Sequence, residues 1–309
     1  VRRHFKAHAF SNATFDDLLA SLAESSGRDL SFWAKQWLKT TGINTFAVEL
    51  DTDDAGVITT AQLVQRGETL RTHRAGVGIY NLVDGKAVRT DRIEMDIDGE
   101  STDIPQLVGR KEQDIDFLLP NDDDLTYALI ELDSKSLEFM VENIDKFADP
   151  MARTLCWSAA WEMTRGGTMR ARDFVALVAR GAAAETELAV LERIVQQAAS
   201  AQSNYADPAW AKESTLLADA LLAGTQDEDP ERSIVFAQAL AKIRLTEGTR
   251  AFLQDVLSSS DDEGLRWYAI AALAADGALD DVPAAIDAQP ARDNSATGHQ
   301  AAVLSLIHI

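Results

Sequence analysis

Apolar positions repeat along this chain with two different periods, and the changes between them divide it into three segments. Over residues 1–44 the apolar positions recur every three or four residues, which is typical of amphipathic helices. Over residues 45–132 apolar and polar positions alternate, which predicts half-buried strands. The helical period returns over residues 133–309. We therefore predict a multidomain α+β protein with a helical, a strand-rich and a second helical part.

The first segment is predicted to contain helices with one apolar face each. One helix is expected to begin after Thr14, a residue type that caps helices, and to stop at Gly27. Its apolar face consists of Phe15, Leu18, Leu19 and Leu22. The next helix is expected to end before Gly42. Its apolar stripe consists of Leu30, Trp33, Ala34, Trp37 and Leu38.

The middle segment is predicted to hold about seven short strands. Alternation is clearest near residues 45–50 and 92–98. Further strand candidates are residues 57–64, 77–83, 114–119 and 125–132. The dipeptide Asp84-Gly85 between two of these runs is a strong signal for a β-hairpin turn. The number and spacing of the strands predict a small β-sandwich over residues 45–132.

The last segment is predicted to form roughly nine or ten helices joined by short loops. Ser134 is expected to cap the first of them. Asp149, Asp207 and Asp229 are each followed by proline. An aspartate at the N-cap and a proline at the first helical position are a common helix start. No fixed repeat length stands out, so an irregular stack of helix pairs is expected rather than a strict solenoid.

The charge of the chain limits the partners it can have. There are 29 basic and 50 acidic side chains, a net charge of −21. This balance opposes nucleic-acid binding, which needs a surface that neutralises phosphates. It is typical of a solvated acidic surface, or alternatively of an acidic vestibule that attracts cationic peptide ends. No apolar run is long enough for a membrane span and the first residues are not a signal peptide, so we expect a cytoplasmic protein without a membrane partner.

The histidines do not predict a metal site. Only His4 and His8 have the i, i+4 spacing of the zinc motif H-E-x-x-H, and Phe5 occupies the position of the glutamate base. Without that carboxylate a zinc-bound water has no nearby acceptor for its proton. We therefore interpret the pair as surface or packing histidines, and we predict no catalytic, cofactor-binding or metal-binding residue in this chain.

Three other motifs have a structural interpretation that is simpler than a chemical one. Cys156 is the one cysteine, and it is expected to pack in the core without a base partner. The run 121–124 (Asn-Asp-Asp-Asp) lacks the glycine of a calcium loop and predicts a turn between strands. The pair 166–167 (Gly-Gly) lacks the features of a phosphate loop and predicts a helix stop.

The tryptophans occur in pairs at helical spacing. Trp33 and Trp37 form one pair, and Trp157 and Trp161 form the other. We expect them to pack in the core on helix faces, with a stacking platform for a ligand as the alternative.

Several segments resemble zinc aminopeptidases of the aminopeptidase N family. The stretch from His8 to Leu19 resembles the end of the family's catalytic domain. The segments that continue this likeness are residues 26–30, 33–34, 37–38 and 42–44, which are closest to actinobacterial-type members, residues 119–128 at the end of the β-domain, and residues 149–153 with Trp157, Trp161 and Arg165 at the start of the helical C-terminal domain.

The resemblance implies an order of domains. Residues 1–44 would be the last helices of a thermolysin-like zinc domain, residues 45–132 a β-sandwich, and residues 133–309 a large HEAT-like superhelical domain. The motifs that bind zinc and perform catalysis in the family lie upstream, so zinc would belong to the parent protein and not to this segment. The residues from Leu304 to Ile309 do not resemble the family's continuation, which suggests a truncated or artefactual end.

The resemblance also implies a function. The parent would remove N-terminal amino acids from peptides, with zinc activating water, while the helical domain covers the active-site cavity and limits substrate access. The partners would be the upstream catalytic domain of the same chain and peptide substrates. The alternative hypothesis is a stand-alone β-sandwich plus helical module that binds a protein or peptide. The coding sequence upstream of Val1 separates the two.

Overall fold

The computed structural model describes residues 1–289, 292–293 and 295–306, and shows helices together with two small sheets. Contacts group the chain into two compact units. The first unit contains residues 1–81 and 89–136, and the second contains residues 82–88 and the chain from Leu137 onward. The change from helix to strand to helix occurs where the periodicity predicts it. The division into three domains at residues 44 and 132 stays a prediction.

The first unit begins with α1 (Arg2–Ala7), α2 (Phe15–Ser26) and α3 (Ser31–Leu38). As predicted, Thr14 caps α2, because its hydroxyl accepts from the amide of Asp17 while the Asp17 carboxylate accepts from the amide of Thr14. Gly27 ends this helix with a φ of 69°. No residue of α1 or α2 is buried within the described chain, so the predicted apolar face of α2 forms without being covered.

Two sheets follow. The first has the strand order β5-β2-β1-β7 and consists of β5 (Ser101–Asp103), β2 (Ile58–Arg66), β1 (Asn44–Thr52) and β7 (Ala128–Ile130). The second has the order β4-β3-β6 and consists of β4 (Lys86–Ile97), β3 (His73–Val83) and β6 (Phe117–Asp122). A short 3₁₀ turn, η1 (Glu112–Asp114), precedes β6. Strand β1 is antiparallel to β2 and parallel to β7.

One hydrophobic core joins the two sheets, as a small sandwich requires. The first sheet contributes Phe46 and Leu63, and the second contributes Val77 and Ile97. Alternating residues of a strand point to opposite faces, which is why the predicted period of two places these side chains together. The turn at residues 84–85 has φ angles of 51° and 78°, so the predicted two-residue hairpin between β3 and β4 is confirmed.

The remaining described chain is helical. Its elements are α4 (Ser134–Asn143), η2 (Ile144–Lys146), α5 (Pro150–Arg165), α6 (Ala171–Gly181), η3 (Ala182–Ala184), α7 (Leu188–Ser200), the π-helical turn η4 (Ala201–Tyr205), α8 (Pro208–Glu213), α9 (Leu216–Gly224), α10 (Pro230–Leu240), α11 (Glu247–Ser259), α12 (Glu263–Ala275), α13 (Val282–Ala288) and α14 (Ala296–Leu306). None of the described helices is long and apolar enough to span a membrane.

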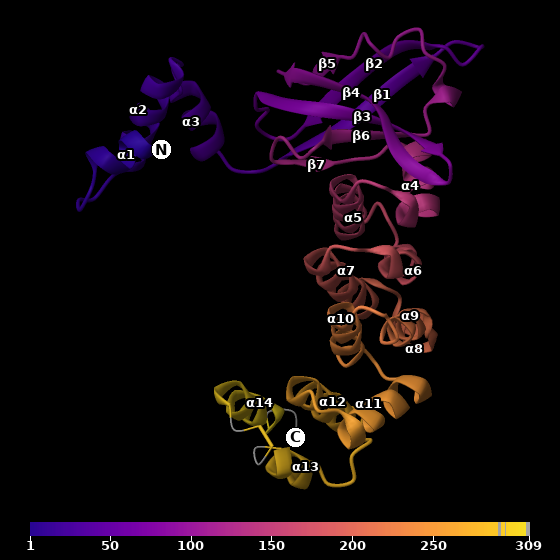
Figure 1. Ribbon diagram of the computed structural model, residues 1–309. Helices are drawn as coiled ribbons and strands as arrows, with labels where there is room; N and C mark the ends of the chain where they lie inside the picture. Colours follow the sequence, from indigo (N-terminus) through magenta and orange to yellow (C-terminus); the bar gives the residue numbers. More distant parts are fainter. Residues whose placement is uncertain (290–291, 294, 307–309) are drawn as a thin grey trace. The chain divides into compact units, whose positions relative to one another are not determined.

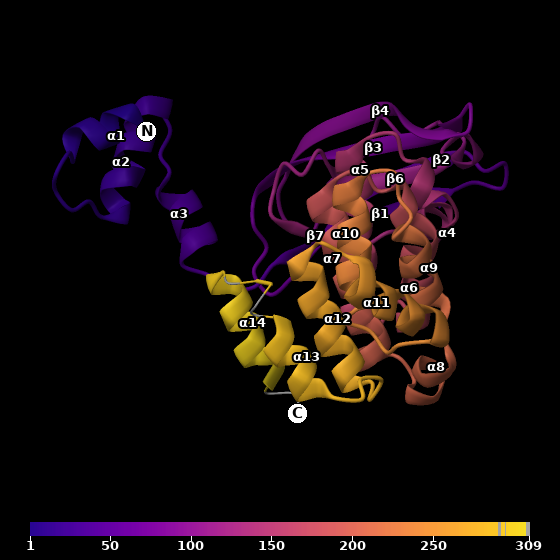
Figure 2. The same cartoon turned by 60° about the horizontal axis from the view of Figure 1, so that its bottom comes forward.

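The helices of the second unit pack as two columns (Figure 1). One column contains α5, α7, α10 and α12, and the other contains α6, α9 and α11. Figure 2 shows α7 and α10 again on one side and α6 and α9 on the other. The helices differ in length, and the π-helical turn η4 lies between α7 and α8, so the paired helices form an irregular stack.

One expectation about a helix start is wrong, and one about the end of the chain lies partly outside the described residues. Helix α4 begins at Ser134, so Ser134 is not its cap. The carboxylate of Asp133 accepts a hydrogen bond from the amide of Ser136 at 2.9 Å and caps the helix instead. Of the suspected artefactual end, residues 307–309 lie outside the described residues.

The three Asp-Pro helix starts are confirmed. Asp149 accepts from the amide of Met151, and Asp229 from the amide of Glu231, both at 2.9 Å. Asp207 accepts from the amides that begin α8, at 2.9 and 3.1 Å. Each carboxylate thus satisfies an amide that has no partner inside its helix, and each proline occupies a position where no amide is needed.

We predict that replacing any one of these three caps by alanine lowers the free energy of unfolding by about 0.5–2 kcal/mol, because the helix loses its capping acceptor. Urea denaturation of Asp149→Ala, Asp207→Ala and Asp229→Ala measures the effect. Asp261→Ala, which changes an exposed aspartate beside the cap Asp262, is the matched control. Unchanged stability in all three cap variants would contradict the assignment.

Candidate functional site

The structure brings no metal-binding group together at the histidine pair. The ring of His4 on α1 lies 4.9 Å from the ring of His8, which directly follows this helix, and Phe5 is 70% exposed. Among the described residues, no group of three or more His, Cys, Asp or Glu side chains is arranged to hold a metal ion. Cys156 is fully buried in α5, as its apolar surroundings in the sequence predict.

The glycine interpretation is confirmed, whereas of the four paired tryptophans only Trp157 is buried, and Trp37 and Trp161 are half-buried. Gly166 caps the end of α5 and Gly167 follows with a φ of 78°, which is a helix stop. Trp157 is buried and Trp161 packs against Phe174 with the ring centroids 5.5 Å apart. The prediction of core packing is wrong for Trp33, whose side chain is 42% exposed, because nothing in the described chain covers that face of α3.

The Asp run forms a turn, but it also supplies a buried charge that the sequence does not reveal. Three of its four residues have positive φ angles, and Asp122 itself is only 1% exposed. Its carboxylate accepts from the hydroxyl of Tyr80 and from the guanidinium of Arg89, both at 2.6 Å. Because these partners are 42 and 33 residues away, a turn prediction based on residue type could not find them. The cluster ties β6 to β3 and β4.

A second buried polar cluster fastens α3 to the sandwich. The guanidinium of Arg71 donates to the Gln36 carbonyl at 3.1 Å and to the Thr40 hydroxyl at 2.9 Å, and lies over the ring of Trp37 at 5.4 Å. Arg71 is 4% exposed, and the neighbouring His73 is 6% exposed. We call this group the α3 clamp. It links a helix of the first segment to the loop that precedes β3.

The tautomer of His73 follows from its partners. Its Nε2 lies 3.2 Å from Asn44 Oδ1 and 3.0 Å from Gln65 Oε1, and both oxygens also accept from Arg71. Two acceptors require a donor, so Nε2 carries the proton, and Nδ1 accepts from the hydroxyl of Thr126. Burial and the charge of Arg71 lower the pKa of His73 to about 4.

The third cluster is a buried ion pair in the helical unit. Arg153 of α5 donates two hydrogen bonds of 3.0 Å to the carboxylate of Glu185, which is fully buried. Trp157 donates a third bond at 2.9 Å, and the amide of Glu187 donates a fourth at 3.0 Å. Arg232 of α10 donates to the Glu185 carbonyl. Burial alone would raise the pKa of Glu185, but these donors hold it below its ordinary value.

These three clusters are closed, because the charged group of each is bonded to other groups of the protein: Asp122 and Glu185 to arginines, and Arg71 to neutral oxygens. A cavity of about 500 Å³ in the helical unit differs in this respect. Its walls are the end of α7 with η4, then α8, and the turn between α10 and α11. Its lining consists of Ala199, Ser200, Gln202, Ser203, Pro208, Ala211, Lys212, Lys242, Ile243 and Arg244.

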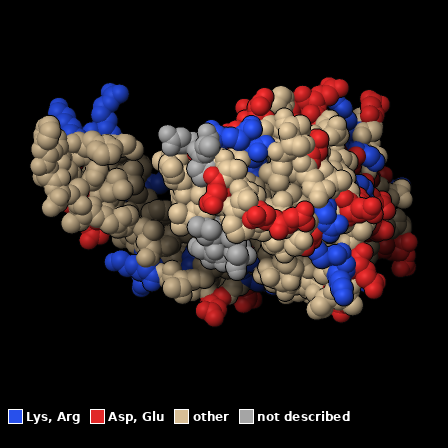
Figure 3. All heavy atoms as spheres, turned by 90° about the horizontal axis from the view of Figure 1, so that it is seen from below, with Lys and Arg blue, Asp and Glu red and all other residues tan. Residues whose placement is uncertain are grey.

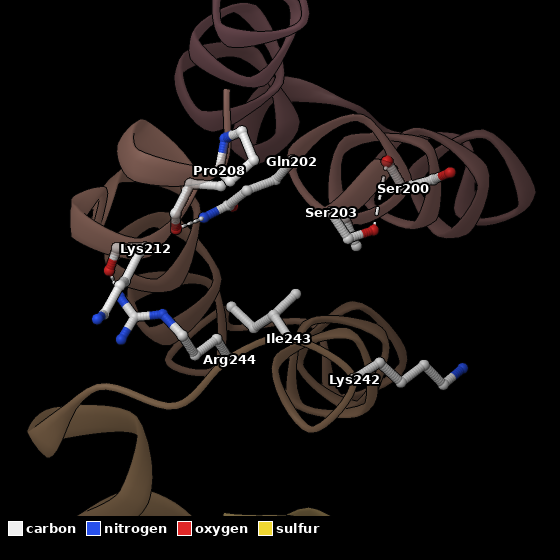
Figure 4. Close-up of a pocket in the computed structure, with 10 residues that line it drawn as sticks. Ser200, Gln202, Ser203, Pro208, Lys212, Lys242, Ile243 and Arg244 are labelled. Atoms are coloured by element: carbon white, nitrogen blue, oxygen red, sulfur yellow. Dashed lines mark hydrogen bonds between the residues drawn. The ribbon is translucent and has the colours of Figure 1, made fainter. Parts of the chain in front are cut away.

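Figure 4 shows how the polar side chains of this cavity lie. Gln202 extends from η4 toward α8, where its amide nitrogen donates to the Ala211 carbonyl at 3.2 Å. Its side-chain oxygen is buried and has no hydrogen-bond partner. Arg244 lies beside Lys212 and donates to its carbonyl, while Lys242 points away from them. The apolar side chain of Ile243 lies between Arg244 and Lys242.

The charge of the cavity is opposite to that of the chain. Three of its described lining residues are cationic and none is acidic, although the net charge of the chain is −21. On the face shown in Figure 3, by contrast, acidic and basic side chains are interspersed. The acidic vestibule considered from the composition is therefore not found at this cavity.

The cavity continues along the column of α7, α10 and α12. A second cavity of about 270 Å³ shares Ala199 and Lys242 with the first, and reaches Tyr268 of α12. The ammonium group of Lys242 lies 5.1 Å from the centre of the Tyr268 ring. We call the two adjoining cavities the groove, and regard it as the candidate binding site of the described chain, since concave pockets with a few open polar groups are typical of ligand sites.

Comparisons with known proteins agree with this architecture. Residues 117–307 match the model of the ERAP1-like C-terminal domain. The chain is 38% identical to aminopeptidase N of Streptomyces lividans over 322 aligned residues. This alignment covers 97% of this chain and 37% of that protein. It also resembles the crystal structure of Legionella pneumophila aminopeptidase A in complex with aspartic acid, with a TM-score of 0.60, 14% identity, and coverage of 98% of this chain and 39% of that one.

The family match shows that this chain contains an ERAP1-like C-terminal domain. The matched residues begin at β6 and continue through the helices that follow the sheets. The chain belongs to the aminopeptidase N family, of which it represents a C-terminal part, as the resemblance of its motifs predicts. It spans little more than a third of the length of the relative that it matches. The low identity to the Legionella structure supports the fold alone.

We predict that Glu185→Gln lowers the free energy of unfolding by about 3–5 kcal/mol, because Arg153 is left buried without its counter-charge. Glu162→Gln is the matched control, since its partner Arg165 is 53% exposed and such surface pairs contribute about 1 kcal/mol or less. Guanidinium denaturation at neutral pH compares the two. Because the pKa of folded Glu185 is lowered, its contribution is present above the unfolded pKa and is lost as pH falls through the folded value. Equal losses in both variants would contradict a buried pair.

We predict a second pH effect, from His73. Its pKa falls from an ordinary 6.5 to about 4 on folding, so between these values the unfolded chain binds a proton that the folded chain does not. The folded state therefore loses about 3 kcal/mol as pH drops from 6.5 to 4. Urea denaturation across this range should show a smaller pH dependence in His73→Gln than in the unaltered chain. His8→Gln, a histidine outside the clamp, should keep the full dependence, and identical curves for all three proteins would refute the effect.

Proposed function

We propose that this chain is the non-catalytic C-terminal part of a zinc metallo-aminopeptidase that removes N-terminal amino acids from peptides. The observation that carries the proposal is the alignment with aminopeptidase N, which covers nearly all of this chain but 37% of that relative. In the printed sequence, the one histidine pair at the spacing of a zinc motif has Phe5 in place of the glutamate base. Zinc and the residues that activate water would thus belong to the upstream part of the parent.

The exposed side chains of the first segment support an upstream partner. Phe10 is fully exposed, Phe32 is 65% exposed, and Trp33 is 42% exposed. Phe10 lies in the turn after α1, and Phe32 and Trp33 lie on α3. Large apolar side chains are costly to leave in water. We infer that residues 1–44 are the last helices of a thermolysin-like catalytic domain and that this surface packs against the rest of that domain.

The helical unit would cover the active-site cavity of the parent and limit the access of substrates. The groove supports this role, because stacked helix pairs of the HEAT-like type offer long concave surfaces to extended peptides. We place the protein in the cytoplasm, with peptides as ligands and with neither nucleic acid nor membrane as partner. The second candidate function, favoured by the groove alone, is a stand-alone module that binds a peptide.

The upstream coding sequence decides between the two functions. An H-E-x-x-H motif in frame before Val1 supports the aminopeptidase, and a start codon directly before Val1 supports the module. In the parent, Ala199→Trp would narrow the groove. Slower cleavage of long peptides with unchanged cleavage of amino-acid arylamides supports the access role, and an equal effect on both substrates argues against it.

We predict that the 309-residue chain alone neither binds zinc tightly nor releases amino acids from peptides or arylamides. Hydrolysis of this kind needs about three protein ligands, an open position for water and a base. Zinc titration and an aminopeptidase assay on the purified chain measure both properties. The double variant His4→Ala/His8→Ala is the control, and metal-dependent turnover that disappears in it would show the prediction to be wrong.

A further inference from the structure

The turn between β6 and β7 holds two large apolar side chains in water. Leu125 is 47% exposed and Tyr127 is 72% exposed. Among the described residues of the two sheets and their connecting loops, no other large apolar side chain is as exposed as Tyr127. Turns between strands are normally made of small and polar residues, so this pair calls for a physical explanation.

The backbone of this turn has a costly conformation. Asn121, Asp123 and Asp124 have φ angles of 57°, 66° and 52°, which lie in the left-handed region. Elsewhere in the described chain, Phe10 and Asp84 are the non-glycine residues with a positive φ. Side chains of L-residues disfavour this region, so three such residues in one turn persist only where the surrounding structure determines them. Strained segments of this kind cluster at functional sites.

Buried hydrogen bonds fix this conformation. Asn121 is fully buried, and its side chain donates to the carbonyl of Thr126 at 2.8 Å and accepts from the amide of Thr126 at 3.2 Å. The amide of Asp124 donates to the Asn121 carbonyl at 2.9 Å. The hydroxyl of Thr126 donates to Nδ1 of His73 at 2.8 Å. The backbone is therefore held on both sides of Leu125, and the two exposed side chains do not belong to a loose loop.

The turn lies next to the exposed face of α3. His73 accepts from Thr126 on one side, and its ring lies 4.9 Å from the ring of Trp37 on the other. Trp33 precedes Trp37 by four residues, so the two side chains share a face of the helix. Trp33 is 42% exposed. Exposed apolar side chains of the helix and of the turn thus flank one buried histidine.

We propose that Leu125 and Tyr127 form a docking surface for the upstream catalytic part of the parent, and that the left-handed turn holds them in position for it. The surface continues the exposed face of α3 and is apolar with one hydroxyl, a composition that fits a protein interface. A partner within the same chain is at hand, because the alignment covers 37% of the relative. The proposal rests on the proposed function and extends the docking surface from residues 1–44 to the sandwich.

The test compares the rate at which a maleimide modifies an introduced thiol in the 309-residue chain and in the parent. The variants are Tyr127→Cys and Leu125→Cys, with Trp33→Cys as a reference for the surface of α3. Cys156 is fully buried, so its thiol contributes a slow background. Mass spectrometry of proteolytic peptides assigns each modification to its site.

Val108→Cys is the matched control. Val108 is 48% exposed and belongs to the same sandwich. The next residue, Gly109, donates to the carbonyl of Ile58, which pairs with Thr52 at the end of β1. His73 is bonded to Asn44 at the opposite end of this strand. The control therefore reports on an exposed position of the sandwich away from the proposed surface.

We expect thiols at positions 125 and 127 to react at least about tenfold more slowly in the parent than in the 309-residue chain, because burial of side chains of this size corresponds to a factor of that order. The thiol at position 33 should be protected in the same way. The thiol at position 108 should react at equal rates in both proteins.

Equal rates at position 127 in both proteins, with protection at position 33, would refute the docking turn and leave the proposed function standing. Equal protection at positions 108 and 127 would also overturn the proposal, since burial would not be specific to the turn. Protection at position 127 that rises with the concentration of the 309-residue chain alone would assign the surface to a second copy instead. A start codon directly before Val1 would overturn both the docking turn and the proposed function.

Discussion

The carboxylate of Glu185 is the point on which the arrangement of the helical unit depends. A buried carboxylate is tolerated only when fixed donors replace the water it has lost. Here the donors come from α5, through Arg153 and Trp157, and from the amide of Glu187 just before α7. Arg232 adds a link from α10 to the Glu185 carbonyl. Glu185 thus links three helices, through its carboxylate to α5 and the start of α7 and through its carbonyl to α10, and two of them, α7 and α10, form walls of the groove.

The same rule separates structural polar groups from candidate binding groups. Asp122, Glu185 and Arg71 are buried, and each is surrounded by donors or acceptors of opposite kind. Nothing remains for a ligand to supply at these places. At the groove, the buried Gln202 oxygen has no hydrogen-bond partner, and Lys212 and Arg244 form no ion pair with a described residue. Burial of a charge is therefore explained in this chain by structural pairing.

Local features could be predicted from the sequence because their causes lie within a few residues. The caps at Asp149, Asp207 and Asp229 depend on the next two or three amides, and the hairpin at residues 84–85 on two backbone angles. Even the error at Ser134 is a shift of one residue, since Asp133 is also a capping residue type.

Features that join distant residues could not be predicted. Arg153 and Glu185 are 32 residues apart, and the groove combines residues near 200 and 212 with residues near 243. Periodicity shows which face of a helix is apolar, but it does not show which other helix will lie against that face. Trp33 illustrates the same limit. The sequence places it on an apolar stripe, but its exposure depends on which other parts of the protein pack against that stripe.

The contrast between α2 and α3 shows how local and tertiary effects separate in this chain. Helix α2 has a full capping box and a glycine stop, yet none of its residues is buried. Helix α3 has no side-chain cap, but Gln36 and the backbone before β1 are bonded to Arg71 and Thr72 of the sandwich. Local capping is enough to define where α2 begins and ends, whereas α3 is defined by what it packs on. The sandwich therefore holds one face of α3, while Phe32 and Trp33 on this helix stay exposed, and no residue of α2 is buried.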